Sequence, residues 1–267
     1  MWMRCEGVAV GIRALREMRE GPVSLVTVSE RNGNAVLELN HPPLNIISMA
    51  LMEDLREALS EVQASGCRGV LIQGAGNCFS AGADVGEHLP EKVGEMLPLF
   101  SRTVIDLMSL EIPAVAFVHG TTLGGGFELA LACDCMVASE DATLGVPEIT
   151  LGVFPPIAAA LLPREVGSKR AMEMILAGGK ISAATALDWG LVNRVGSIEV
   201  AEKFLQRISR YPRPALVAAK KSTRENFIDR LREADRIYLE EMMAHPEPVE
   251  GLKAFLERRD PAWKETP

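Results

Sequence analysis

Leu123-Gly124-Gly125-Gly126-Phe127-Glu128 is the stretch that decides how this 267-residue chain folds. It follows residues 114–118, an apolar run entered through a proline and typical of a buried strand. It leads into the apolar run 129–133, which is predicted to be helical. Glycines without Cβ atoms let other groups approach the backbone closely, and a helix that begins there exposes N–H groups and its positive dipole end. The stretch therefore predicts a tight strand-to-helix turn that can stabilise a developing negative charge.

The bulk composition limits the classes of protein to consider. A chain of 267 residues that is 48% hydrophobic can bury a large core. Its net charge of −8 argues against a nucleic-acid partner, which requires clustered Lys and Arg. Five irregularly spaced cysteines favour reduced thiols and a cytoplasmic location. No apolar run is long enough to cross a bilayer, so no membrane partner is expected.

Strands alternate with helices in the first two thirds of the chain. Residues 24–29 and 35–39 flank Asn32-Gly33-Asn34 and predict a hairpin. Ser48 is predicted to cap a helix, which is followed by a buried strand at 69–73. A further short strand is predicted at 136–138. Later in the chain, helices are predicted at 168–177, 183–189, 200–210, 214–227, 230–243 and 249–258.

This pattern indicates an α/β fold with a helical C-terminal region. We divide the chain into an N-terminal extension (1–23), a core that holds the active site (24–200) and a helical part (201–267).

A second turn complements the glycine stretch. Phe79-Ser80-Ala81-Gly82-Ala83-Asp84 follows the predicted strand at 69–73 and consists mostly of small residues. It can turn sharply and offer the N–H group of Ala83. Together with the N–H of Gly125, this would form a two-donor oxyanion hole for a thioester oxygen. Asp84 is predicted to cap the helix that follows.

Two carboxylates accompany the predicted hole. Glu128 lies three residues after Gly125, in the first helical turn, and Glu148 follows Pro147, which fixes its position. Two neighbouring carboxyls can share one proton, so one can deprotonate water while the other supplies a proton. The alternatives are a packing hinge at the glycines and a surface position for Glu148.

Competing sites have weaker support. No Lys-Ser/Thr pair follows the glycines, which argues against a P-loop. Cys133 and Cys135 lack the further ligands of a zinc site, so no metal is predicted.

These motifs resemble those of the crotonase superfamily, the enoyl-CoA hydratase/isomerase proteins, over about residues 24–264. The resemblance rests on residues 79–84, 119–130, 144–148, 186–192 and 250–259. It implies a crotonase-like spiral of ββα units with a C-terminal helical region that forms a homotrimer, often paired into a hexamer. The substrate would be an acyl-CoA, with no separate cofactor because coenzyme A is part of the substrate.

The resemblance also implies roles for individual residues. Ala83 and Gly125 match the oxyanion-hole donors, and Glu128 and Glu148 match the two catalytic glutamates. Both glutamates favour hydration, because isomerases and decarboxylases of the superfamily commonly lack one of them. The further residues implied to bind substrate are Ala81, Asp84, Val85, Pro155, Pro156, Phe255 and Lys264.

Two proline pairs indicate the acyl group. Pro155-Pro156-Ile157 stands where ordinary hydratases are rich in glycine, and with Pro42-Pro43-Leu44-Asn45 it resembles the cyclohexa-1,5-diene-1-carbonyl-CoA hydratases of anaerobic aromatic degradation. This implies a flat alicyclic substrate. The alternatives are a stiffened loop in a straight-chain enoyl-CoA hydratase, an enoyl-CoA isomerase, or a non-catalytic acyl-CoA-binding or RNA-binding relative.

Overall fold

A computed structural model of the protein describes residues 24–224 and 226–263. The predicted extension 1–23 and the predicted substrate residue Lys264 lie outside these described residues. Among the described helices, none combines the length and apolarity that crossing a bilayer requires.

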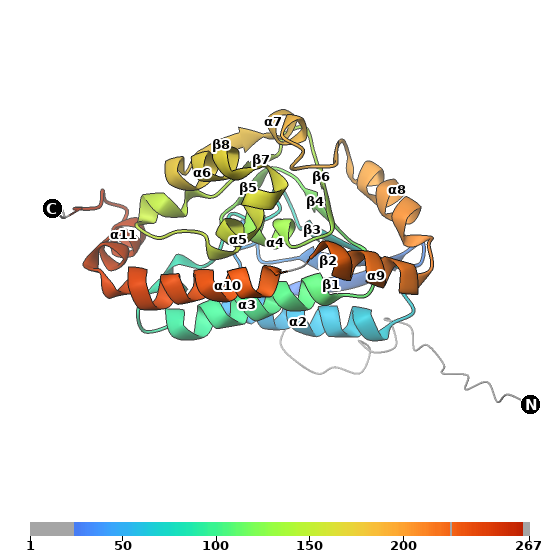
Figure 1. Ribbon diagram of the computed structural model, residues 1–267, viewed down its shortest axis with the longest axis horizontal. Coiled ribbons are helices and arrows are strands. Elements are labelled where there is room, and N and C mark those ends of the chain that lie inside the picture. Colours follow the sequence, from blue (N-terminus) through green and yellow to red (C-terminus); the bar gives the residue numbers. More distant parts are fainter. Residues whose placement is uncertain (1–23, 225, 264–267) are drawn as a thin grey trace, which may run out of the picture.

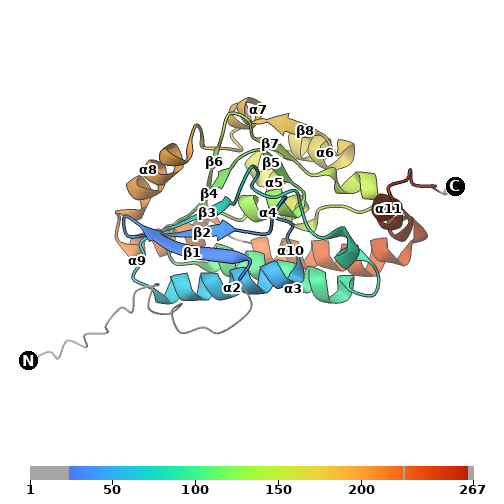
Figure 2. The same cartoon turned by 180° about the vertical axis from the view of Figure 1, so that it is seen from behind.

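Two β-sheets form the centre of the molecule (Figures 1 and 2). In the larger sheet only the first pair of strands is antiparallel. Its spatial order is β1 (Val26–Arg31), β2 (Asn34–Leu39), β3 (Val70–Gly74), β4 (Ala114–Val118), β6 (Cys135–Ala138) and β9 (Arg194–Val195). The smaller sheet contains β5 (Thr121–Leu123), β7 (Thr143–Gly145) and β8 (Lys180–Ser182).

Successive turns of the chain add one segment to each sheet. β4 of the larger sheet leads into β5 of the smaller one, and β6 leads into β7. The turn after β3 follows the same path, because Ser80 forms a parallel bridge with Thr122 of β5. Thr122 is in turn paired with Leu144 of β7. This arrangement confirms the expected α/β spiral of ββα units.

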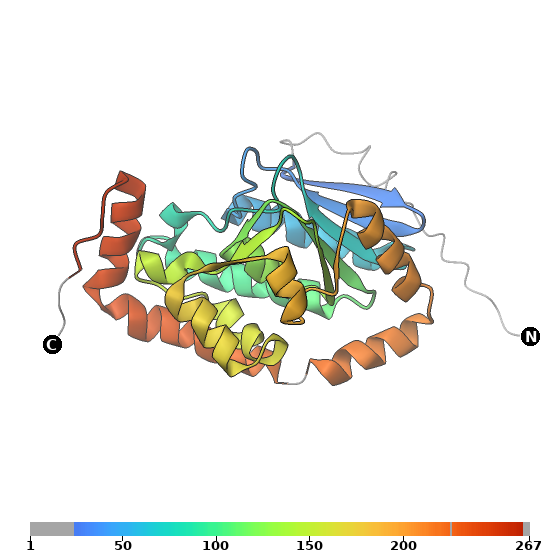
Figure 3. The same cartoon turned by 90° about the horizontal axis from the view of Figure 1, so that it is seen from above.

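Helices cover both faces of the larger sheet. α8 packs on one face through a small apolar cluster, while α2 and α3 belong to the main core on the other. α3 and α10 lie side by side (Figure 1), and the orange and red C-terminal helices border the core in Figure 3. The α-helices are α2 (Met49–Ala64), α3 (Val93–Ser109), α4 (Gly125–Leu131), α5 (Pro156–Glu165), α6 (Ser168–Ala177), α7 (Ala183–Asp188), α8 (Ile198–Ser209), α9 (Arg213–Thr223), α10 (Phe227–Arg236) and α11 (Pro246–Glu257). Shorter helical turns are η1 (Val85–His88), η2 (Pro147–Leu151), η3 (Ile237–Glu241) and η4 (Met242–Ala244).

The predicted helices need several corrections. The prediction of one helix over 214–227 is wrong at its end, because α9 stops at Thr223 and α10 begins at Phe227. Asn226, with a left-handed φ of 62°, separates the two helices. The helix predicted at 230–243 is α10 continued by a π-helical and a 3-10 turn. α3 was not predicted, although its buried residues recur at helical spacing around Pro98.

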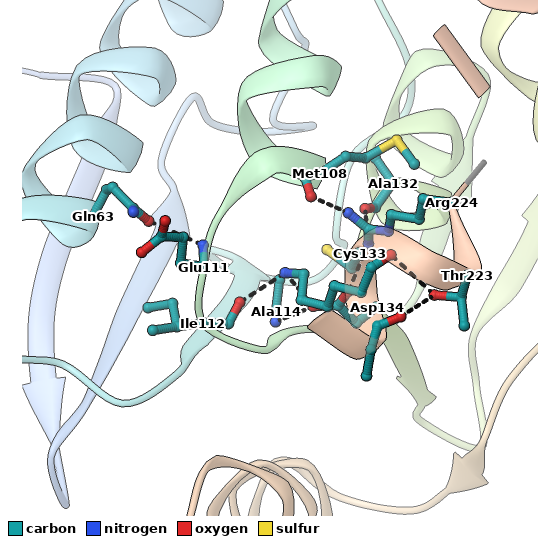
Figure 4. Close-up of polar contacts among 12 residues, drawn as sticks. Gln63, Met108, Glu111, Ile112, Ala114, Ala132, Cys133, Asp134, Thr223 and Arg224 are labelled. Atoms are coloured by element: carbon teal, nitrogen blue, oxygen red, sulfur yellow. Dashed lines mark hydrogen bonds and ion pairs between the residues drawn. The ribbon is translucent and has the colours of Figure 1, made fainter. Parts of the chain in front are cut away.

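Asp134 joins the C-terminal helices to the larger sheet (Figure 4). Its Oδ2 accepts from the backbone N–H of Ala114 at 2.7 Å and pairs with Lys220 Nζ at 2.8 Å. Its Oδ1 pairs with Arg224 at 2.7 Å, and Arg224 also donates to the carbonyl oxygen of Ala132. The Asp134 side chain is only 16% exposed. Its carboxylate therefore binds the Lys220 and Arg224 side chains and the backbone of β4 at a position with little access to water.

We expect Asp134→Ala to lower the free energy of unfolding by about 3 kcal/mol, because it leaves Lys220 and Arg224 without their buried counter-charge. The matched control is Asp106→Ala, which removes an ion pair with Arg56 whose side chains are 41% and 37% exposed. Its effect should stay below about 1 kcal/mol. Urea unfolding measures both, and equal losses would contradict the anchoring role of Asp134.

Candidate active site

A cavity of about 300 Å³ lies where the smaller sheet meets α4. Nearly all of the described residues that the sequence assigned to substrate or catalysis line it. They are Ala81, Ala83, Val85, Gly125, Glu128, Glu148, Pro155, Pro156 and Phe255. Asp84 is not among the lining residues; its Oδ1 accepts from the N–H of Gly86 at 2.8 Å and caps η1, as predicted.

The spiral sets the spacing of the key residues. Ser80, Thr122 and Leu144 are paired across the three successive turns. Ala83 and Gly125 each lie three positions beyond their paired residue, and Glu148 lies four positions beyond Leu144. Residues far apart in the sequence therefore meet because neighbouring strand segments end at the same level.

The two predicted oxyanion-hole donors lie close together. A Cβ atom on Gly125 would lie 3.0 Å from the Cβ of Ala83 and 3.2 Å from its backbone nitrogen. Neither backbone N–H donates a hydrogen bond to any of the described residues. Gly125 is also the first residue of α4, where N–H groups lack helical partners. Two unpaired donors thus border one cavity, as an oxyanion hole requires.

Gly124 allows Glu148 to approach this turn. Its φ of 51° belongs to the left-handed region that glycine adopts most readily. A Cβ at this position would lie only 2.8 Å from Oε1 of Glu148. The first glycine of the triplet is therefore required both by the backbone conformation and by the adjacent carboxyl group.

Glu128 is buried in the first turn of α4, with 3% of its surface exposed. Burial raises the pKa of its carboxyl to about 7, and the charge of Asp235 also raises it. The backbone N–H groups of Ala158 and Ile157 act in the opposite direction, and Ala158 donates to Oε1 at 2.9 Å. Glu128 is thus poised to change protonation near neutral pH.

The proline pair begins the helix that carries these N–H donors. Pro155 is the N-cap of α5 and Pro156 its first residue, so Ile157 and Ala158 carry the first free N–H groups of the helix. Because the N-terminus of a helix carries partial positive charge, it favours the ionised form of a carboxyl beside it. The prolines therefore begin the helix whose N-terminus favours the ionised form of Glu128. They also line the cavity.

Glu148 belongs to η2, directly after Pro147. The residue keeps some exposed surface, but its Oε2 is buried and has no hydrogen-bond partner among the described residues. Burial raises the pKa of Glu148 well above its ordinary value, and the charge of Glu128 raises it further. Because each carboxyl disfavours ionisation of the other, two such groups can share one proton.

Three polar residues near this pair were not predicted from the sequence. Tyr238 and His88 line the cavity, and Asp235 lies one helical turn before Tyr238. His88 Nδ1 lies 2.8 Å from the carbonyl oxygen of Asp84, and burial lowers the pKa of its ring. Burial raises the pKa of Asp235 to about 6. Asp235 and Tyr238 come from C-terminal helical segments in which no local motif marks them.

Metal-binding geometry is not found in the part of the chain that the structure describes. There, no group of three or more His, Cys, Asp or Glu side chains is arranged to hold an ion. Cys133 and Cys135 are free thiols, and burial raises the pKa of Cys135 to about 11.

The raised pKa of Glu128 predicts that stability falls as pH rises from 4.5 to about 7. In this window the folded protein keeps a proton that the unfolded chain has lost, so deprotonation favours unfolding. We expect the wild-type protein to lose up to about 3 kcal/mol more than Glu128→Gln, whose side chain does not titrate. Urea unfolding of both proteins between about pH 4 and about pH 8 measures the difference. Parallel stability curves would contradict the prediction.

Comparisons with known proteins agree with this site. The sequence matches the model of the enoyl-CoA hydratase/isomerase family over residues 29–266. It is 36% identical over 256 residues to the cyclohexa-1,5-dienecarbonyl-CoA hydratase of Thauera aromatica, covering 92% of this chain and 99% of that one. It is also 36% identical over 247 residues to a probable enoyl-CoA hydratase of Bacillus subtilis, covering 86% and 95%. The crystal structure of an enoyl-CoA hydratase from Mycobacterium avium subsp. paratuberculosis superimposes with a TM-score of 0.78 at 30% identity, covering 91% of this chain and 100% of the other. The chain belongs to the enoyl-CoA hydratase/isomerase family.

Proposed function

We propose that this protein is a cytoplasmic, homo-oligomeric hydratase that adds water to an α,β-unsaturated acyl-CoA. The observation that carries the proposal is that one cavity is lined by two residues whose N–H groups have no partner among the described residues and by two glutamates with raised pKa values. Addition of water to an enoyl thioester needs these two elements, because it passes through an enolate and transfers two protons.

The N–H groups of Ala83 and Gly125 would bind the thioester oxygen. As water attacks the β-carbon, negative charge moves onto this oxygen, where the two donors stabilise it. Removing one such donor typically costs about 2.7–4 kcal/mol of transition-state stabilisation. The collapse of the enolate then requires a proton at the α-carbon.

The two glutamates have different surroundings, and the roles that we assign to them follow from this difference. The N-terminus of α5 favours the ionised form of Glu128, which is therefore assigned as the base that orients and deprotonates water. For Glu148 the backbone donor that lowers the pKa is its own N–H, and Oε2 has no partner among the described residues. Burial, and then the charge of Glu128, hold the pKa of its carboxyl high. Glu148 is therefore assigned as the acid that protonates the α-carbon.

Glu128→Gln and Glu148→Gln are each expected to reduce the initial rate of hydration by about 100-fold or more, because each amide removes one proton-transfer group. The matched control is Glu140→Gln, an exposed position, which should keep the wild-type rate. Light scattering should give the mass of a trimer or hexamer for all three variants. A near-normal rate in either active-site variant would refute its assigned role.

A compact cyclic dienoyl-CoA is the proposed substrate. The cavity wall includes Pro155, Pro156 and the aromatic rings of Phe154 and Tyr238, which present rigid surfaces suited to a flat ring. The relative from Thauera aromatica is named for such a substrate. The equally similar relative from Bacillus subtilis is named an enoyl-CoA hydratase, so a straight-chain substrate is the second candidate.

Product masses separate these candidates. We expect one water to be added to cyclohexa-1,5-diene-1-carbonyl-CoA much faster than to crotonyl-CoA. Faster addition to crotonyl-CoA would assign a straight-chain substrate and contradict the cyclic one. A shifted double bond without a gain in mass would instead indicate an isomerase, and binding without any turnover a non-catalytic relative.

A further inference from the structure

Tyr238 lies in the wall of the cavity but has no part in the proton transfers described above. The residue is 1% exposed, and its hydroxyl has no hydrogen-bond partner among the described residues. Burying a hydroxyl group without a partner is unfavourable, and a phenylalanine would fill nearly the same space without that penalty. The hydroxyl therefore indicates a polar partner that arrives with the ligand.

The backbone and two rings fix the position of Tyr238. It belongs to η3, a π-helical segment that continues α10 and in which the N–H of Met242 donates to the carbonyl oxygen of Ile237. Such wide turns within helices often occur at functional sites. The ring centroid lies 5.6 Å from that of Phe154 and 6.5 Å from that of His88. The phenol is therefore held in place before a ligand binds.

Both catalytic carboxyls act on this phenol. Burial raises the pKa of Tyr238, and the charges of Glu128 and then Glu148 raise it further. The hydroxyl consequently stays protonated and is available as a neutral hydrogen-bond donor. The phenol and both carboxyls line the same cavity.

The Tyr238 hydroxyl needs an oxygen atom of the reacting groups as its hydrogen-bond acceptor. The thioester oxygen already has the N–H groups of Ala83 and Gly125. We propose that the Tyr238 hydroxyl donates a hydrogen bond to the oxygen atom that the reaction adds, first as water beside Glu128 and then as the product hydroxyl. The inference rests on the proposed hydratase function. Tyr238 keeps its proton throughout and orients the oxygen, while Glu128 accepts the proton of water.

The first test compares Tyr238→Phe with Tyr211→Phe, which alters the other tyrosine of the chain at a position 51% exposed. Tyr238→Phe should lower kcat for hydration by about tenfold or more, the effect of losing one hydrogen bond in the transition state. Tyr211→Phe should leave kcat unchanged. An unchanged kcat in Tyr238→Phe would overturn the inference while leaving the hydratase function intact, provided that the wild-type protein is active. Failure of the wild-type protein to hydrate any enoyl-CoA would overturn both.

A second measurement distinguishes this contact from a merely structural role. Calorimetry would compare the binding of the hydroxyacyl-CoA product with that of the deoxy analogue, which carries hydrogen in place of the hydroxyl and is otherwise identical. In Tyr238→Phe, affinity for the hydroxy compound should fall by about tenfold, and affinity for the deoxy analogue should stay the same. Equal losses for both compounds, or no loss for either, would overturn the proposal.

Discussion

The hydrogen bond from the backbone N–H of Ala158 to Glu128 is the interaction on which the active site depends. It joins the first turn of α4 to the first turn of α5. Without it, burial alone would hold Glu128 protonated and unable to accept a proton from water. The helix N-terminus offsets that effect in part, and the pKa of Glu128 comes to about 7.

This constraint explains why the two carboxyls differ although they share one cavity. Glu128 has backbone donors, whereas Oε2 of Glu148 has no partner among the described residues. Burial, and then the charge of Glu128, raise the pKa of Glu148 well above its ordinary value. The different tasks that we propose for the base and the acid therefore follow from two environments that act on the same type of side chain.

The sequence predicted the parts of this site that depend on local backbone. The glycine triplet marked the turn and the start of a helix, and Asp84 was identified as a cap, because both features act within a few residues. Tyr238 and Asp235 could not be found in this way. Tyr238 reaches the cavity, with Asp235 one helical turn before it, because α10 packs against α3 and α5. Their helical segments carry ordinary amphipathic patterns. The break at Asn226 also escaped prediction, although Asn is one of the few residues besides Gly that adopt a left-handed conformation readily.

The pairing of Ser80, Thr122 and Leu144 has a consequence for how such a protein can diversify. The residues that we propose to bind the thioester and to move protons follow these stacked positions, whose separation is set by strand hydrogen bonding at about 4.8 Å. Phe154 and Tyr238, by contrast, lie on connections and C-terminal helical turns outside the stack. Insertions or substitutions in those outer segments can reshape the acyl pocket while the reacting groups keep their mutual spacing. One catalytic apparatus can therefore serve many acyl groups, and changes in specificity are expected to accumulate in the periphery.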